Sequence, residues 1–315
     1  MTDKLQPAIV ADGLTKSFPG VCAVSKLSFD VRAGEIFGLV GPDGAGKTTT
    51  LRMLAGIMPP DAGNAAIAGI DVVHNPERAK HSLSYMPQRF GLYEELSVDE
   101  NIRFYADLFG VTRAEREKRS AELLKAAGMS EFRSRFAGKL SGGMKQKLGL
   151  ICALIHRPKV ILLDEPTTGV DPVSRRDFWR ILYELLAEGV AILTSTAYLD
   201  EAERCHRVAL LNQGKLLFCD APDNLKAKLR KDVLMIVSRD PRKVRSVLER
   251  AEGISSLVLQ GDGLRLVVDD AKRRAGEFDA ILRRAHASFD SIQQVAPTIE
   301  DLFVDAVGAG GVVSA

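Results

Sequence analysis

The feature that most restricts what this chain can fold into is a glycine-rich segment between an apolar run and a helical pattern. Residues 41–48 read Gly-Pro-Asp-Gly-Ala-Gly-Lys-Thr, which fits the pattern G-x-x-x-x-G-K-[S/T]. Residues 36–40 before it predict a buried strand, and residues 46–56 after it predict a helix. In this context glycine backbone amides and the amino end of the helix bind phosphate groups. The alternative is a glycine-rich turn with a Lys-Thr pair by chance.

Two side chains of the segment suit a nucleoside triphosphate and its metal. We expect Lys47 to reach the β- and γ-phosphates, and the hydroxyl of Thr48 to ligate Mg²⁺. The other residues expected to bind the nucleotide come from the same segment and the helix start. They are Gly41, Pro42, Asp43, Gly44, Ala45, Gly46 and Thr49.

A second apolar run ends in two carboxylates. Residues 160–163 are followed by Asp164 and Glu165. Because the carboxyl ends of parallel strands meet at one edge of a sheet, we expect both side chains near the glycine-rich segment. Asp164 is predicted to enter the Mg²⁺ shell, and Glu165 to act as a general base or to orient the attacking water. Alone this pattern is a weak signal, but together with residues 41–48 it becomes strong.

Alternating strand and helix patterns predict an α/β fold with a parallel sheet. Residues 8–33 alternate apolar and polar groups, which favours a β-hairpin or a small antiparallel sheet. Further strands are expected at 159–163 and 190–193, and helical patterns at 98–128 and 174–188.

The composition changes near Asp220. Residues 233–307 predict the order strand, helix, strand, strand, helix, strand, helix, with the second helix at 277–287. This order indicates a small βαββαβ module without a motif for chemistry. Its basic side chains are interpreted as a solvated face, with a docking or nucleic-acid patch as the alternative. They are Arg242, Lys243, Arg245, Arg273, Arg274, Arg283 and Arg284.

Charge and hydropathy limit the kind of partner. The 315 residues hold 43 Lys and Arg against 41 Asp and Glu, so no global field favours nucleic acid. No stretch reaches the ~18 apolar residues of a spanning helix, and residues 1–13 lack the apolar core of a secretory signal. We therefore expect any membrane role to go through other subunits. The four cysteines form no C-x-x-C pair, which favours reduced thiols.

Residues 140–147, Leu-Ser-Gly-Gly-Met-Lys-Gln-Lys, narrow the class further. A serine and two glycines at a helix start offer a hydroxyl and backbone amides to a phosphate. The segment resembles the signature motif of ABC transporter ATPases, usually L-S-G-G-Q, although Met144 replaces the glutamine. The resemblance implies that Ser141, Gly142 and Gly143 act across a dimer interface, on ATP held by the other subunit. A simple helix N-cap is the alternative.

Other matches to this family follow in order along residues 8–220. By resemblance, Phe18 stacks on adenine, although a core phenylalanine at a strand end would read the same way. Gln88 resembles the glutamine that touches Mg²⁺ and the attacking water and links the site to the membrane subunits. The loop 166–172 resembles the segment that crosses the dimer interface at Asp171.

One departure from the family pattern concerns the γ-phosphate. Ala197 stands where the family normally has a histidine, and an alanine methyl offers no hydrogen bond. This favours an asymmetric pair, in which this chain's own ATP turns over slowly and its Ser141 completes the site of a partner. The alternative is a homodimer in which Thr196, Tyr198 or water replaces the histidine.

The resemblance implies a fold. It is a P-loop NTPase with a RecA-like core, an antiparallel β subdomain and a helical subdomain at about 88–158, followed by a small C-terminal α+β domain. We expect an ABC nucleotide-binding domain at 1–225 and the small extension at 230–310. The phrases at 96–101 and 198–203 are typical of ATPases of the ABC-2, drug-resistance exporter type.

The resemblance also implies a role. The chain would bind ATP and Mg²⁺ and hydrolyse ATP in an exporter, coupling closure of an ATPase dimer to separate ABC-2-type permease subunits. It would act without nucleic acid, as a cytoplasmic protein peripheral on the inner face of the cell membrane. One alternative is a largely non-hydrolysing regulatory subunit of a heterodimer. Another is an ABC protein acting on ribosomes or DNA, but such proteins usually carry tandem domains or coiled-coil inserts.

Overall fold

The computed structural model describes residues 7–308. Residues 1–6 and 309–315 lie outside the described part. The outer ends of both predicted domains, and part of residues 1–13, where no secretory signal is predicted, therefore lie outside it too. The chain divides into two compact units that meet between Cys219 and Asp220. The predicted domain limits at 225 and 230 stay predictions.

A six-stranded sheet forms the centre of the first unit. Its strands are β3 (Ile36–Val40), β6 (Leu83–Met86), β7 (Val160–Asp164), β8 (Ala191–Thr196), β9 (Arg207–Asn212) and β10 (Lys215–Asp220). They lie in the order β10-β9-β3-β8-β7-β6, and the pairs that join β9, β3, β8, β7 and β6 are parallel. Every residue of β3 and β7 is buried, as in a sheet covered on both faces. The predicted parallel sheet is confirmed.

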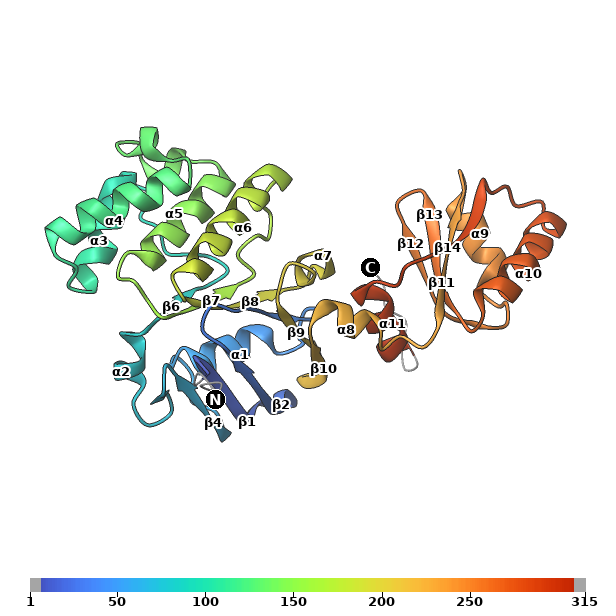
Figure 1. Ribbon diagram of the computed structural model, residues 1–315, viewed down its shortest axis with the longest axis horizontal. Helices are drawn as coiled ribbons and strands as arrows, with labels where there is room; N and C mark the ends of the chain where they lie inside the picture. Colours follow the sequence, from blue (N-terminus) through green and yellow to red (C-terminus); the bar gives the residue numbers. More distant parts are fainter. Residues whose placement is uncertain (1–6, 309–315) are drawn as a thin grey trace. The chain divides into compact units, whose positions relative to one another are not determined.

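A second, antiparallel sheet belongs to the same unit. Its strands are β1 (Ile9–Phe18), β2 (Val21–Val31), β4 (Ala62–Ile67) and β5 (Ile70–Asp71), in the order β2-β1-β4-β5. The first two form the predicted hairpin. Helix α1 (Lys47–Leu54) contacts strands of both sheets, and Figure 1 shows it on the side of the central sheet where β1, β2 and β4 lie. The apolar side chains of α1 and both sheets form one core.

The other described helices of the first unit are α2 (Pro76–Lys80), α3 (Val98–Leu108), α4 (Arg113–Ala126), α5 (Gly142–Leu154), α6 (Pro172–Ala187) and α7 (Leu199–Ala202), with 3₁₀ turns at Ser130–Phe132 and Ala137–Lys139. Four of them, α3 to α6, begin at a side chain that caps the first turn. Figure 1 shows α3 to α6 on the side of β6, β7 and β8 opposite α1. The helical pattern predicted at 98–128 is divided into two helices. Gly110 ends the first with φ +68°, and Thr112 starts the second with a capping box to Glu115.

The second unit is a four-stranded antiparallel sheet with helices. Its elements are α8 (Pro222–Lys226), β11 (Asp232–Val237), α9 (Pro241–Leu248), β12 (Ile254–Gln260), β13 (Gly263–Val268), α10 (Ala271–Arg284), β14 (Ser291–Val295) and α11 (Ile299–Gly308). The sheet has the order β12-β13-β11-β14, and the order of elements from β11 onward is the predicted one. Phe278 and Leu282 of α10 and Val244 of α9 pack on Leu234 and Leu266 of the sheet.

Helix α10 begins earlier than predicted. It starts at Ala271, whereas the sequence pattern placed the start at Glu277. The Asp270 side chain accepts a hydrogen bond from the backbone amide of Arg273 at 2.9 Å and so caps the helix. The helix then continues through Gly276, because its first turn is already fixed.

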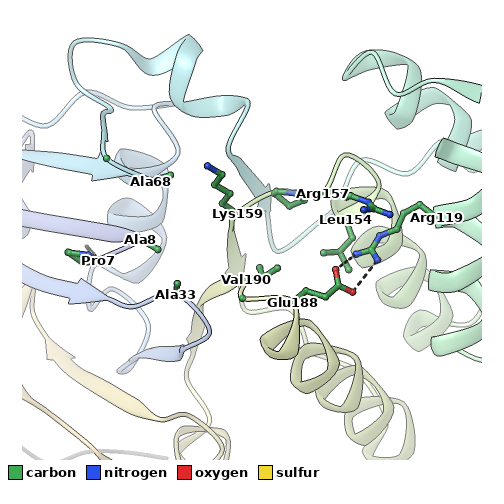
Figure 2. Close-up of a pocket in the computed structure, with 13 residues that line it drawn as sticks. Pro7, Ala8, Ala33, Ala68, Arg119, Leu154, Arg157, Lys159, Glu188 and Val190 are labelled. Carbon is green, nitrogen blue, oxygen red and sulfur yellow. Dashed lines mark hydrogen bonds and ion pairs between the residues drawn. The ribbon is translucent and has the colours of Figure 1, made fainter. Parts of the chain in front are cut away.

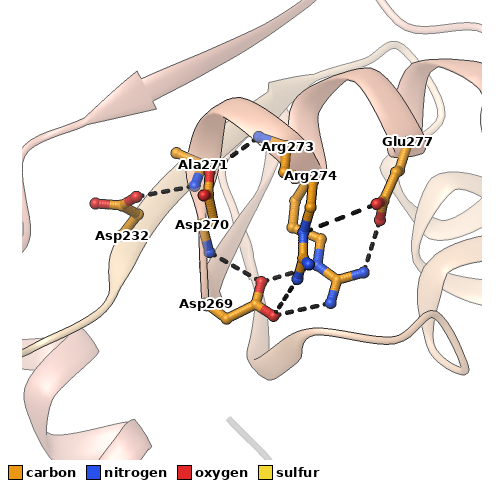
Figure 3. A network of polar contacts seen from close by, with 7 residues as sticks. All are labelled: Asp232, Asp269, Asp270, Ala271, Arg273, Arg274 and Glu277. Carbon is orange, nitrogen blue, oxygen red and sulfur yellow. Dashed lines mark hydrogen bonds and ion pairs between the residues drawn. The ribbon is translucent and has the colours of Figure 1, made fainter.

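The prediction of a solvated basic face is wrong for Arg274. Its side chain is 10% exposed, and Figure 3 shows it between two carboxylates. Nε and Nη2 donate to Asp269 at 2.8 Å each, and Nη1 donates to Glu277 at 2.6 Å. The hydrogen bonds from Arg274 lower the pKa of the Asp269 carboxyl. Arg274 therefore fixes the start of α10 to the preceding turn and is not available to a partner.

Across residues 7–308, every helix is too short or too polar to cross a bilayer.

Candidate nucleotide-binding site

The loop between β3 and α1 has glycines at two positions where a side chain does not fit. A Cβ at Gly41 would collide with the carbonyl oxygen of Leu211, and one at Gly46 with that of Ala23. Gly46 also has φ +99°, a conformation that residues with a Cβ rarely adopt. The backbone is therefore free to turn its amides toward a phosphate ahead of α1.

Lys47 is the first residue of α1, and it is 4% exposed. Its Nζ donates to the carbonyl oxygens of Gly41 at 2.8 Å and Pro42 at 3.1 Å. The same atom lies 3.1 Å from Oε1 of Glu165. The ammonium is thus held over the loop, next to the predicted base, where a bound phosphate would meet a fixed positive charge.

Asp164 ends β7 and accepts hydrogen bonds from three hydroxyl groups. Thr48 Oγ1 donates to Oδ1 at 3.0 Å, and Ser195 Oγ donates to the same oxygen at 2.8 Å. The hydroxyl of Tyr85 donates to Oδ2 at 3.2 Å. Burial and the charge of Asp164 raise the pKa of Tyr85 to about 12, so the phenol remains a donor at neutral pH.

Thr48 and Asp164 offer the ligands that Mg²⁺ prefers. The ion takes oxygen ligands at about 2.0–2.1 Å in a near-octahedral shell. The two side-chain oxygens are 3.0 Å apart, a spacing that suits two neighbouring positions of such a shell. Among the described residues, no group of three or more His, Cys, Asp or Glu could hold a metal ion. Mg²⁺ is often held by one or two protein oxygens together with water and phosphate.

Glu165 follows Asp164 in a backbone conformation that is unusual for a residue with a side chain, with φ +49°. Its Oε2 accepts hydrogen bonds from Gln88 Nε2 at 3.3 Å and from Thr168 Oγ1 at 3.4 Å. Gln88 is exposed and comes from the loop after β6. The predicted base and the predicted glutamine are therefore in direct contact.

A cavity of about 480 Å³ brings most of the predicted residues together. Phe18, the predicted adenine contact, is 42% exposed and lies in its wall. The lining residues are Phe18, Val21, Ala23, Asp43, Gly44, Ala45, Gly46, Lys47, Thr48, Thr49, Gln88 and Glu165. Gly41, Pro42 and Asp164 adjoin the cavity through their bonds to Lys47 and Thr48.

The predicted cross-interface residues do not line this cavity. Ser141 caps α5, and its Oγ accepts from the amide of Met144 at 3.3 Å. Asp171 caps α6, and hydrogen bonds from Ser174 lower the pKa of its carboxyl. A Cβ at Gly143 would collide with the Ser174 side chain, so the starts of α5 and α6 are in close contact. Gly142 lies in the same exposed turn as Ser141.

The position of the missing histidine is open to solvent. Ala197 follows β8 and is exposed, and no described histidine lines the cavity. His206 is also exposed, and its Nδ1 accepts from the amide of Ile36 at 3.1 Å. Ile36 begins β3, whereas the glycine loop follows the other end of that strand. His206 therefore lies at the end of β3 away from the predicted γ-phosphate position.

Sequence reasoning gave no role to two residues that hold Asp164. Tyr85 and Ser195 lie at the carboxyl ends of β6 and β8, the strands that flank β7. Polar side chains at the ends of strands next to the Asp164 strand were the signal that could have identified them.

Another cavity of the first unit lies at the other edge of the central sheet. It measures about 740 Å³ and reaches Lys159 and Val190, which precede β7 and β8. Figure 2 shows Arg119 paired with Glu188 in its wall, at 2.9–3.1 Å. Arg157 and Lys159 follow the carboxyl end of α5, where basic side chains offset the helix dipole. Because this structural role accounts for them, we assign no ligand to the cavity.

The parallel sheet, the glycine loop before α1 and the Thr48–Asp164 pair define a P-loop nucleotide-binding protein. Residues 24–168 match the ABC transporter family model. The probable multidrug ABC transporter ATP-binding protein YbhF of Escherichia coli (strain K12) is 45% identical over 309 residues, which are 96% of this chain and 52% of YbhF. The daunorubicin/doxorubicin resistance ATP-binding protein DrrA of Streptomyces peucetius is 32% identical over 96% of this chain and 92% of its own length.

Solved structures agree with this assignment. The dimeric structure of MJ0796, a bacterial ABC transporter cassette, has a TM-score of 0.62 and 25% identity and covers 68% of this chain and 98% of the cassette. The chain belongs to the ATP-binding subunits of ABC transporters, a family of ATPases. It spans about half the length of the YbhF relative. The predicted family and fold class are confirmed.

Proposed function

We propose that the chain hydrolyses Mg-ATP to drive an exporter, through separate transmembrane permease subunits of the ABC-2 type. YbhF and DrrA, which are named for multidrug transport and drug resistance, support the exporter assignment. In this proposal the chain works at the inner face of the cell membrane and binds no nucleic acid.

The observation that carries the proposal is the division of the predicted site residues into two sets. Phe18, the glycine loop, Gln88 and Glu165 line one cavity, whereas Ser141 and Asp171 lie at helix starts outside it. Ser141 is exposed and needs a phosphate from elsewhere to serve as more than a cap. A second ATPase subunit would bring its own nucleotide against Ser141. Each ATP would then lie between two subunits, and its binding would favour the closed dimer.

Different residues of the cavity carry out different parts of ATP hydrolysis. Lys47 and the loop amides bind the phosphates and stabilise the charge that develops on the γ-phosphate. Glu165, oriented by Gln88 and Thr168, accepts the proton of the attacking water. When bound through Thr48 and Asp164, Mg²⁺ would neutralise phosphate charge. Phe18 offers an exposed ring for stacking on the base.

An aromatic cluster links this chemistry to a surface for the permease. Phe90, two residues after Gln88, contacts Tyr105 with ring centroids 5.1 Å apart, and Tyr105 contacts Phe104 at 5.4 Å. Phe104 in turn contacts Tyr93 at 4.7 Å, and these last two rings are each 40% exposed. Exposed aromatic rings in a group favour protein contact. A permease segment docked here would act on Gln88 through these packed rings and the short stretch of chain that joins Phe90 to Gln88.

The other functions weighed from the sequence find no support. Lys47, Asp164 and Glu165 are all in place at the cavity, which argues against a subunit that cannot hydrolyse ATP. The relatives named above are ATP-binding subunits for multidrug transport and drug resistance, not ribosome or DNA proteins. A Ser141→Arg variant distinguishes a second subunit that is another copy from one that is a different chain.

The proposal is tested by co-purification and turnover. The chain is expressed together with the multi-spanning permease that we expect to be encoded next to it, and the complex is placed in proteoliposomes. We expect the permease to retain the chain and to raise its ATPase rate, and a Phe104→Ala/Tyr93→Ala variant to lose both effects. A chain with full ATPase activity that never associates with the permease would contradict the transport role.

A further inference from the structure

Ser195, at the carboxyl end of β8, joins the predicted metal carboxylate to the predicted base. The residue is fully buried, and the parallel register places it beside Asp164. Its Oγ lies 2.8 Å from Asp164 Oδ1 and 3.0 Å from the backbone nitrogen of Glu165. One hydroxyl group therefore touches both residues at once.

The chemistry of the partners fixes the direction of both hydrogen bonds. An ionised carboxylate only accepts, and a backbone amide only donates. The single Ser195 proton must therefore point to Asp164, and an oxygen lone pair must receive the amide of Glu165. This leaves the hydroxyl no alternative orientation that keeps both bonds.

The same residue also restrains the backbone of Glu165. The Glu165 amide lies 3.2 Å from the carbonyl oxygen of Ser195, in addition to its bond to the hydroxyl. Glu165 has φ +49°, which side chains with a Cβ disfavour, so this turn needs external contacts to persist. Thr48 and Tyr85 also hold Asp164, but their hydrogen bonds do not reach Glu165.

We propose that Ser195 is a positioning residue that sets the placement of Asp164 relative to Glu165. It is fully buried and does not line the cavity, and it keeps the metal carboxylate and the base in register across the ends of β7 and β8. This inference rests on the proposed function of the cavity, because it gives Asp164 and Glu165 the roles stated there.

The test compares metal-dependent and metal-independent binding in the full-length chain. Ser195→Ala should weaken the apparent affinity for Mg²⁺ in the presence of ATP by about 10- to 100-fold, as loss of an outer partner of a ligand typically does. Calorimetry with ATP in EDTA should show no change, because the glycine loop and Lys47 are untouched. Hydrogen exchange in a peptide covering residues 160–168 should become faster, because the Glu165 amide loses an acceptor.

Two further variants separate positioning from a general structural role. Ser195→Thr keeps the hydroxyl and should restore the Mg²⁺ dependence, whereas Ser195→Cys, a weak donor, should fall in between. Thr194→Ala removes an equally buried hydroxyl from the same strand and should leave Mg²⁺ dependence unchanged. The inference is overturned if Ser195→Ala leaves both the Mg²⁺ affinity and the hydrogen exchange of residues 160–168 unaltered. It is also overturned if Ser195→Ala weakens ATP binding equally with and without Mg²⁺. If Ser195→Ala does not fold, the Thr and Cys variants decide by the same readouts.

A Lys47→Ala variant distinguishes failure of the role proposed for Ser195 from failure of the function proposed for the cavity. If Lys47→Ala leaves ATP binding intact, the nucleotide site itself is wrongly placed. If Lys47→Ala weakens ATP binding while Ser195→Ala behaves as wild type, only the positioning role of Ser195 fails.

Discussion

The ammonium of Lys47 lies 3.1 Å from Oε1 of Glu165. The cation predicted to bind phosphate and the predicted general base therefore form an ion pair. Lys47 is 4% and Glu165 13% exposed, which keeps solvent from screening the pair. A γ-phosphate that binds to Lys47 competes with this carboxylate. Nucleotide binding would then release Glu165 from Lys47 at the step when a base is needed.

Lys47→Ala should weaken Mg-ATP binding by about 10- to 100-fold, since a hydrogen bond to a charged group contributes about 1.5–3 kcal/mol. The fixed cation over the loop is lost, and Glu165 is left without its partner. Calorimetry of the purified chain measures the effect. Lys118→Ala, an exposed lysine on α4, serves as the control and should bind like wild type. Equal affinity in both variants would remove Lys47 from the phosphate site.

Glu165→Gln should lower ATP turnover by about 10²–10⁴-fold, as loss of a general base typically does. Binding should be retained or become tighter, because a neutral amide competes less with phosphate for Lys47. Single-turnover kinetics and calorimetry report the two effects separately. Glu184→Gln, an exposed glutamate on α6, is the matched control. Unchanged turnover in a complex of identical copies would take Glu165 out of the catalytic role.

Ser141→Arg should abolish ATPase activity while the isolated chain still binds ATP normally, because Ser141 is not part of its own cavity. Ser130→Arg places the same charge at another exposed serine of the helical layer and should remain active. With the natural partner present, an asymmetric pair predicts that Ser141→Arg is more damaging than Glu165→Gln. If Glu165→Gln is the more damaging, or the chain alone hydrolyses ATP briskly, the pair consists of identical copies.

Removing residues 220–315 should leave ATP affinity unchanged, because every residue of the cavity belongs to the first unit. Calorimetry on the shortened chain, checked for folding by circular dichroism, measures this. A folded chain that no longer binds ATP would show that the second unit takes part in the site.

Phe278→Ala should destabilise the second unit by about 3–5 kcal/mol, since it removes a fully buried ring from the core of that unit. ATP affinity of the first unit should not change. Urea unfolding followed by hydrogen exchange in each unit measures the effect. Leu259→Ala, at a side chain that is 37% exposed in the same sheet, should cost less. Equal losses in the two variants would mean that Phe278 is not a core residue.

Local patterns predicted the parts of the site that depend on short stretches of chain. The loop 41–48 needs a strand before it and a helix after it, and both are visible as apolar periodicity. Sequence did not reveal the network of Tyr85, Ser195 and Asp164, because it depends on which strands are neighbours in the sheet. A one-residue change of register would turn Ser195 to the other face.

The second unit shows the same limit in a helix. The predicted helix start at Glu277 comes after Gly276 and after the basic run around Arg274. The cap at Asp270 and the pairing of Arg274 with Asp269 outweigh both features. Such pairing across a turn depends on three-dimensional placement that periodicity does not record.

The separation of Ser141 from the cavity has a consequence for gene dosage. If each active site needs a second subunit, the ATPase rate per molecule falls as the chain becomes dilute, and single copies hydrolyse little ATP. Cells that produce the chain in excess over its membrane partner would then accumulate idle monomers and waste little ATP. Expression level could therefore vary widely with little effect on cellular ATP, and transport capacity would follow the scarcer subunit.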